Sequence, residues 1–410
     1  MAAVPVLTYT VKYSWLVDLF VASCIAAATI GYASARKPAR TPPNKYWRQR
    51  IDADLMPIIG AAGVIGNLAL LYGASRTGIS INPSILIANL SEVREESLGS
   101  AASGGFGGPF ALLGSFLSPC SFLYLVLSAR LTHNRALAWA NFGLIVFVAF
   151  AYFGGRQTII VAILLLLCAL WLRGRPILRF DVRTTALLGV AVVAGWYFVT
   201  TFSQQRQKDS DPSYLLRVTG RAEYKPWIKA PANRNETLGS SVLQFSYFST
   251  PLPSLTFWMQ QTTVPAPLLG QYSFPLPAQL LSSYLGDDNT DQWQKARRKV
   301  FLPFSSRGYL DNAWATGLRD LVADFSPIGA VIFYALLGVF MAWARNLFEM
   351  TGGAFYHALE SYAAVLFGFG AFQSLLYTDY FSYGLFLAWG VVIIQSGRRG
   401  PRRAAQTRVG

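Results

Sequence analysis

The sequence predicts an all-α polytopic membrane protein with about nine (nine to eleven) transmembrane helices and one large, mostly helical loop outside the membrane. Three observations lead to this fold class. Hydrophobic residues make up 53% of the 410 residues and charged residues only 13%, whereas soluble domains carry about 25% charge. About nine apolar segments approach the ~20 residues that a spanning helix needs. Lys and Arg are concentrated in the connections on one side of these segments.

The apolar segments define the predicted helices in chain order. The first is followed by Arg-Lys-Pro-Ala-Arg rather than by a small-residue cleavage site, so we expect it to remain as a membrane anchor. The fourth and fifth are separated only by Gly-Gly-Arg-Gln, which predicts a tight hairpin. The predicted spans are Tyr13–Ser34, Leu55–Ala74, Phe110–Ala129, Ala136–Phe153, Thr158–Leu172, Ala186–Thr201, Pro327–Ala344, Ala358–Tyr377 and Phe381–Gln395.

The orientation follows from the basic residues in the short connections. Arg and Lys cluster after the first span, after the fifth span and in the C-terminal tail. Cytoplasmic loops carry this excess, so we expect a multi-pass protein of a bacterial inner membrane with a cytoplasmic C-terminus. An odd number of spans places the N-terminus outside. The predicted parts are an N-terminal bundle (1–202), a large periplasmic loop (203–326), C-terminal transmembrane helices (327–396) and a basic tail (397–410).

Several function classes are disfavoured by the sequence. The net charge of +15 is explained largely by topology, so we expect no nucleic-acid partner. Cys24, Cys120 and Cys168 lie in apolar segments, and His133 and His357 lack a partner at metal-ligand spacing, so we expect neither a metal site nor a cofactor. No nucleotide-binding, GxSxG or HExxH motif is present. Because ATP is absent outside the inner membrane, an enzyme acting there must use a pre-activated, lipid-linked donor.

Arg156 in the predicted hairpin is the first candidate site residue. Gly154 and Gly155 precede it and Gln157 follows it. Glycines let the backbone approach a ligand closely, and Arg binds phosphate oxygens with two parallel hydrogen bonds. The alternative is a positioning charge that reaches the headgroups from the end of a hairpin.

The segment that leads into the seventh span is the second candidate. If it is helical, Asn312, Thr316 and Arg319 share one face at i, i+4, i+7 spacing, and Asp320 and Asp324 share another. Such polar faces above the bilayer could hold a sugar and a phosphate together. The alternative is a solvated helix start with Asp311 as its N-cap. The same segment also contains Arg307. Weaker candidates, which the sequence also allows as solvated charges, are Arg94, Arg206, Arg217 and Arg221.

Four motifs in order resemble one known family. Asn-Leu-Ser-Glu-Val-Arg ends at Arg94, Gly-Gly-Arg-Gln-Thr contains Arg156, Tyr247 stands four residues before Pro251, and an Asn-to-Gly run extends from Asn312 into the seventh span. Over residues 80–345 this order is similar to that of the Wzy-type oligosaccharide repeat unit polymerases, which make O-antigens and exopolysaccharides. Where the family has Asp-Phe-Gly, this chain has Asp324-Phe325-Ser326.

The resemblance implies a GT-C-like glycosyltransferase bundle that joins undecaprenyl-pyrophosphate-linked repeats outside the membrane. It implies that Arg156, Arg307 and Arg319 neutralise the pyrophosphate without a metal. Asp311 or Asp324 would be the general base. The implied substrate-binding residues are Arg94, Gln157, Arg217, Arg221, Tyr247, Asn312 and Thr316. The implied partners are lipid-linked oligosaccharides, membrane lipids, a flippase and a chain-length regulator.

Two other functions stay open at the level of the sequence. An O-antigen ligase would attach finished chains to an acceptor, but the histidine that such ligases offer as a base has no counterpart in the loop 203–326. A flippase or other transporter of the same lipid would carry charges deep within its spans. The sequence offers few such charges, namely Asp18 and Glu360.

Overall fold

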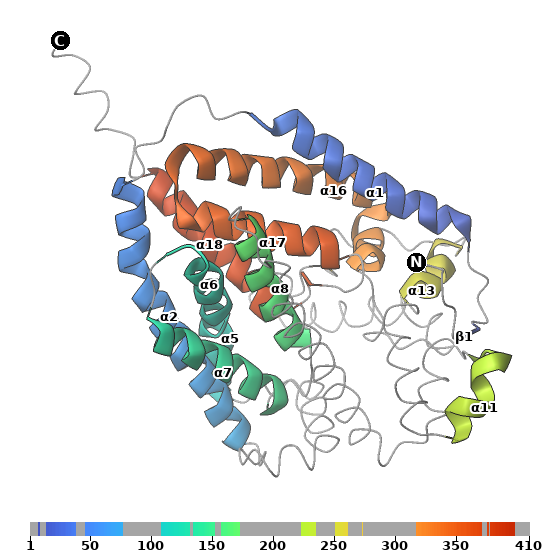
Figure 1. Cartoon of the computed structure of the whole chain (residues 1–410), viewed down its shortest axis with the longest axis horizontal. Coiled ribbons are helices and arrows are strands. Elements are labelled where there is room, and N and C mark those ends of the chain that lie inside the picture. The colour runs from blue at the N-terminus through green and yellow to red at the C-terminus, as the bar shows by residue number, and fades with distance from the viewer. Residues whose placement is uncertain are drawn as a thin grey trace, which may run out of the picture.

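The computed structural model describes residues 7–8, 14–37, 46–76, 108–131, 134–151, 157–172, 223–234, 251–260, 273, 317–370, 375–376 and 378–397. This part of the chain is mostly helical, with one small sheet (Figure 1). The helices are α1 (Trp15–Ala35), α2 (Tyr46–Arg76), α5 (Gly108–Leu117), α6 (Pro119–Ser128), α7 (Arg135–Ala151), α8 (Gln157–Leu172), α11 (Pro226–Arg234), α13 (Pro251–Met259), α16 (Gly317–Thr351), α17 (Ala354–Phe369) and α18 (Asp379–Gly397).

A helix overlaps each predicted span that falls within the described residues, although α17 (Ala354–Phe369) begins and ends before the predicted Ala358–Tyr377. Three helices, α1, α2 and α16, are long and apolar enough to cross a membrane, and the stretch through α5 and α6, α7, α8 and α18 are shorter apolar helices. The predicted third span is divided into α5 and α6 at Ser118, because Pro119 has no N–H to continue the hydrogen-bond ladder. The predicted span Ala186–Thr201 lies outside the described residues.

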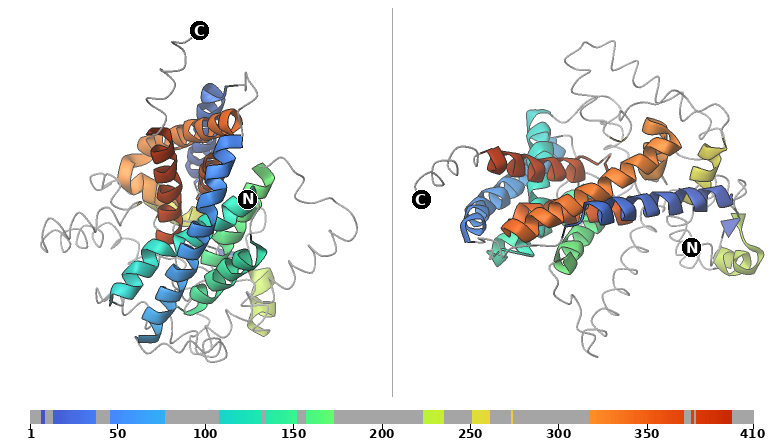
Figure 2. Two further views of the ribbon diagram at one scale, coloured as in Figure 1. Left: turned by 90° about the vertical axis from the view of Figure 1, so that its left-hand side faces the viewer. Right: turned by 90° about the horizontal axis from the view of Figure 1, so that it is seen from above.

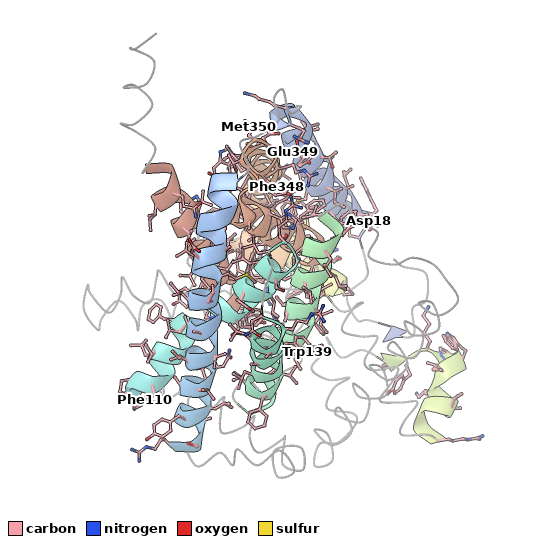
Figure 3. The ribbon with its side chains drawn as sticks, turned by 60° about the vertical axis from the view of Figure 1, so that its left-hand side comes forward. Asp18, Phe110, Trp139, Phe348, Glu349 and Met350 are labelled. Atoms are coloured by element: carbon pink, nitrogen blue, oxygen red, sulfur yellow. The ribbon has the colours of Figure 1, made fainter. Side chains whose placement is uncertain are left out.

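The helices carry apolar side chains outward as well as inward. On α16, Ile328, Ile332 and Leu336 recur every four residues and expose 74%, 54% and 61% of their surface, while Ala330 and Tyr334 face the bundle and are buried. Phe110 and Trp139 lie exposed on other helices (Figure 3). Apolar surface of this extent is unfavourable in water but not in lipid. The described residues are therefore compatible with an all-α membrane protein.

Helices α1 and α16 pack side by side and run in the same direction (Figures 1 and 2). Val17 and Phe20, near the start of α1, share an apolar cluster with Leu321 near the start of α16. At the other end, Arg36 follows α1 and pairs with Glu349 of α16 at 2.6 Å. Both helices are candidate membrane spans, and as parallel helices they would cross a bilayer in the same direction.

A two-stranded antiparallel sheet ties the start of the chain to a segment of the predicted outer loop. Strand β1 (Leu7–Thr8) pairs with β2 (Glu223–Tyr224), with Leu7 opposite Tyr224 and Thr8 opposite Glu223. Tyr224 is half-buried, and this burial raises the pKa of its hydroxyl. Since β1 precedes α1 by only a few residues, the pairing places this part of the loop at the end of the bundle where α1 begins (Figure 1).

Candidate functional site on the outer half of helix α16

Helix α16 is broken at Ser326, whose backbone has φ 69° and ψ 169°. Among the described residues other than glycine, only Ser326 has a positive φ. Pro327 follows it and starts the second half of the helix without needing a hydrogen-bond partner for its nitrogen. The Ser326 hydroxyl caps this second half by accepting a 3.4 Å hydrogen bond from the Gly329 N–H. The break separates a short N-terminal helix, Gly317–Phe325, from the remainder of α16. We call it the outer half-helix, because the sequence predicts this end of α16 outside the membrane.

The outer half-helix carries three ionisable side chains that are all buried. Arg319 and Asp320 are each 2% exposed and Asp324 is fully buried. Arg319 donates from Nε and from Nη2 to the same Asp320 oxygen, Oδ1, at 3.1 and 2.9 Å. The alternative of a solvated helix start is wrong for residues 318–324, because every one of them is buried. Asp311, the expected N-cap in that alternative, lies outside the described residues.

Asp324 holds a residue of the predicted outer loop. Its Oδ2 accepts a 2.6 Å hydrogen bond from the backbone N–H of Ser273. Asp320 and Asp324 are one turn apart on the same helix, as their i, i+4 spacing predicts. The two carboxylates thus have different partners, the first a guanidinium on its own helix and the second a backbone amide from the loop.

Apolar packing surrounds this group of charges. The half-helix residues Leu318, Leu321 and Val322 share a cluster with Val17 of α1 and with Trp258 of α13. The N–H of Gly317 donates to the carbonyl of Gly370 at 2.8 Å, which joins the start of α16 to the end of α17. A small, mostly apolar cavity lies at this junction. Its lining residues are Ser273, Gly317, Leu321, Phe333, Tyr334, Leu366, Gly370, Leu375 and Leu376.

The structure brings together only some of the predicted site residues. Arg319 and Asp324 lie on the outer half-helix, whereas Gln157 is the first residue of another helix, α8, and is partly buried. The other predicted residues lie outside the described residues: Arg94, Arg156, Arg217, Arg221, Tyr247, Arg307, Asp311, Asn312 and Thr316.

A second polar group, which we call the Arg345 cluster, lies at the opposite end of α16 and was not predicted. It consists of Arg36, Arg345, Asn346, Glu349 and Glu360. Glu349 pairs with Arg36 at 2.6 Å and with Arg345 at 2.8 Å, and Glu360 lies 3.6 Å from Arg345. The Glu349 carboxylate raises the pKa of Arg36 above its ordinary value. Figure 3 shows Glu349 near the end of α1.

Asp52 of α2 is a further buried carboxylate that the sequence analysis missed. Its Oδ2 accepts a 2.6 Å hydrogen bond from the N–H of Ala354, the first residue of α17, and its Oδ1 accepts a 3.0 Å bond from Gln395 of α18. The sequence signal that could have identified Asp52 is its place three residues before the predicted span that begins at Leu55.

The sequence predicted two charges deep within the spans, Asp18 and Glu360. Glu360 is 2% exposed, whereas Asp18 is exposed.

The outer half-helix combines a cation, two carboxylates and a break in the backbone at one end of an apolar bundle. Such a combination can bind an anionic group and accept a proton. No group of three or more His, Cys, Asp or Glu side chains that could hold a metal occurs among the described residues.

No family model matches the chain, and neither a curated protein nor a solved structure matches it. The described residues therefore define only a class: a mostly helical protein with three candidate membrane-spanning helices and a group of buried charges.

Proposed function

We propose that this protein is a membrane glycosyltransferase that polymerises undecaprenyl-pyrophosphate-linked oligosaccharide repeats on the periplasmic face of a bacterial inner membrane. The acceptor hydroxyl attacks the anomeric carbon of the growing chain, the bond from that carbon to the pyrophosphate breaks, and undecaprenyl pyrophosphate leaves. A carboxylate takes the proton of the hydroxyl. Because the leaving group is already good, the protein supplies mainly position and charge stabilisation.

The observation that carries the proposal is the backbone of Ser326. The chain departs from the family's Asp-Phe-Gly motif at Ser326, which stands where the family has glycine. A φ of 69° with a ψ of 169° is a conformation that is almost confined to glycine. Residue 326 therefore has a backbone conformation that suits a glycine, which supports the alignment of the motif with residues 324–326.

The positions of the buried charges also support the proposal. Arg319, Asp320 and Asp324 lie at the end of the bundle where α1 begins, together with strand β2 of the predicted periplasmic loop. We assign Arg319, with Arg156 and Arg307, to the pyrophosphate, and Asp324 or Asp311 to the acceptor hydroxyl. We further propose nine spans and a GT-C-like bundle, since α1 and α16 cross in the same direction, as the first and seventh of nine spans must.

The direct test uses the purified full chain and undecaprenyl-pyrophosphate-linked repeats isolated from cells that lack this protein. We expect a ladder of lengthening lipid-linked chains on a gel. Arg319→Ala and Arg156→Ala should abolish the long products at equal protein level, and Arg156→Lys should restore them only in part. Unchanged ladders with both arginine variants would remove these residues from the mechanism.

Cells that lack this protein also distinguish the alternative functions by which lipid-linked product they accumulate. Loss of a polymerase leaves single repeats on the lipid, outside the membrane. Accumulation of long lipid-linked chains instead would identify a ligase. Accumulation of single repeats on the inner leaflet would identify a flippase, and either result would overturn the proposal.

A further inference from the structure

Helix α11, in the predicted outer loop, exposes a large aromatic side chain. Trp227 is 59% exposed, whereas the next residue, Ile228, is buried at 9%. One face of the helix, at i, i+3, i+4 and i+7 spacing, consists of Trp227, Ala230, Pro231 and Arg234. All four are exposed. Alanine and proline are too short to cover an indole ring, so this face, which we call the Trp227 face, is open to a partner.

The charge of α11 is entirely basic. Lys229 and Arg234 are exposed, and residues 226–234 contain neither Asp nor Glu. A helix that combines tryptophan with Lys and Arg is typical of segments that lie on a membrane surface. There the indole ring sits among the headgroups, and the cations are attracted to the phosphates of anionic lipids.

The pairing of β1 with β2 keeps α11 close to the membrane boundary. Trp15 is 69% exposed at the start of α1, a candidate membrane span, and tryptophan at the end of a span favours the interface. Strand β1 ends at Thr8, so the chain from there to Trp15 can reach no more than about 25 Å. Only Lys225 separates β2 from α11. Figure 1 accordingly shows α11 beside β1, at the end of the bundle where α1 begins.

We propose that α11 is an interfacial anchor that binds anionic phospholipid headgroups beside the start of α1. The Trp227 face lies among the headgroups, Lys229 and Arg234 contact their phosphates, and the predicted outer loop is thereby held against the bilayer. Because the sheet tethers α11 near the membrane, the effective concentration of lipid is high and a few weak contacts are sufficient. The inference is independent of the proposed function, since it needs a bilayer and no saccharide.

The experiment measures whether α11 lies in the bilayer surface. A spin label is attached to Ala230→Cys, on the Trp227 face, in a full chain whose three native cysteines are replaced by serine. Nanodiscs contain phosphatidylcholine alone or an equal mixture with phosphatidylglycerol. Power saturation then compares the access of oxygen, which concentrates in lipid, with that of a water-soluble nickel chelate. We expect oxygen access to exceed nickel access in the mixed bilayer and to do so much less in phosphatidylcholine. A label at Glu223→Cys, on the neighbouring strand, should remain accessible to nickel in both.

Substitutions separate the contributions of the ring and of the charges. Trp227→Ala should return the label to water, and Trp227→Phe should retain most of the docking. Lys229→Gln and Arg234→Gln should each lower the ratio of docked to free α11 about fivefold in the mixed bilayer, and high salt should have the same effect. Matched controls are Trp139→Ala, at a 72% exposed tryptophan of α7, and Lys37→Gln, at an exposed lysine after α1. Neither should move the label.

Three results would overturn the inference. In the first, the label at residue 230 is as accessible to nickel as the label at residue 223 in both bilayers. In the second, it is equally immersed in both bilayers and insensitive to the charge substitutions, which would exclude anionic headgroups as the partner. In the third, only added oligosaccharide protects the label, which would identify a glycan surface instead. If Trp227→Ala does not fold, the Phe and Gln variants decide by the same criteria.

Discussion

Ser326 holds a backbone conformation that costs a residue with a Cβ about 1–3 kcal/mol, since its φ is 69°. Ser326→Gly should relieve this strain and lose only a few tenths of a kcal/mol as a helix cap. We expect the variant to be more stable by about 1 kcal/mol. Thermal unfolding of the detergent-solubilised protein measures the change.

Ser326→Ala is the control for this substitution. It keeps the strained backbone and removes the hydroxyl that accepts the Gly329 N–H. It should therefore be less stable than the wild type by about 1 kcal/mol. If the glycine variant is destabilised as much as the alanine variant, the strain at residue 326 is not the dominant effect.

Asp52 should contribute more to stability than an ordinary acidic residue. Its carboxylate caps α17 through the Ala354 N–H and accepts from Gln395 of α18. Asp52→Ala leaves both donors without this acceptor in a buried setting, and we expect a loss of about 2–4 kcal/mol. Asp54→Ala, two residues along the same helix but exposed, should change the unfolding temperature little. Equal effects of the two substitutions would contradict the assigned role.

At the scale of the element, close packing of α1 against α16 depends on two glycines. A Cβ at Gly31 would overlap the carbonyl oxygen of Ala335, and a Cβ at Gly338 would overlap that of Ala28. Small residues permit this approach between membrane helices. Because backbone atoms cannot move aside singly, Gly31→Ala and Gly338→Ala should each destabilise the protein by about 2 kcal/mol or more.

Gly143 of α7 is the matched position for this prediction, because an added Cβ meets no atom within 4 Å there. Gly143→Ala should be neutral or stabilising by up to about 1 kcal/mol, since alanine is the better helix former. Unfolding in detergent compares the three variants. Equal changes in stability for all three variants would show that helix propensity, rather than the packing of α1 against α16, determines the effect.

The elements themselves could largely be predicted from the sequence. Apolar length and flanking basic residues are local signals, and they located α1, α7 and α8 closely, whereas α2 begins at Tyr46, well before the predicted Leu55. The division at Ser118 was missed because a proline can also occur within a continuous span. The prediction placed Asp320 and Asp324 on one face, and the structure agrees.

The site could be predicted only in part, because its remaining features depend on tertiary contacts. The bond between Asp52 and Ala354 joins residues far apart in the chain, and no periodicity encodes it. The Arg319–Asp320 pair violates the usual i, i+4 rule for helix neighbours. The positive φ of Ser326 occurs at a residue type that seldom adopts it, so only the packed structure could reveal it.

At the scale of the whole molecule, several described polar contacts join helix ends that the proposed nine spans would place on one side. Nine spans place the C-terminal ends of α1, α8, α16 and α18 and the N-terminal ends of α2 and α17 on one side. In the structure, Arg345 donates to Leu172 at the end of α8, Arg36 joins Glu349, and Asp52 joins Ala354. Ends that the topology assigns to the cytoplasmic side thus meet one another.

This arrangement predicts which surface residues face each side of the membrane. Glu223 of β2 and Lys37 after α1 are both exposed, and nine spans place Glu223 outside and Lys37 inside. In a chain with Cys24, Cys120 and Cys168 replaced by serine, we expect a membrane-impermeant thiol reagent to label Glu223→Cys in spheroplasts. It should label Lys37→Cys only after permeabilisation. Labelling of Lys37→Cys in intact spheroplasts would reverse α1, and because α16 is parallel to α1 it would also move the Arg319 site to the cytoplasmic face.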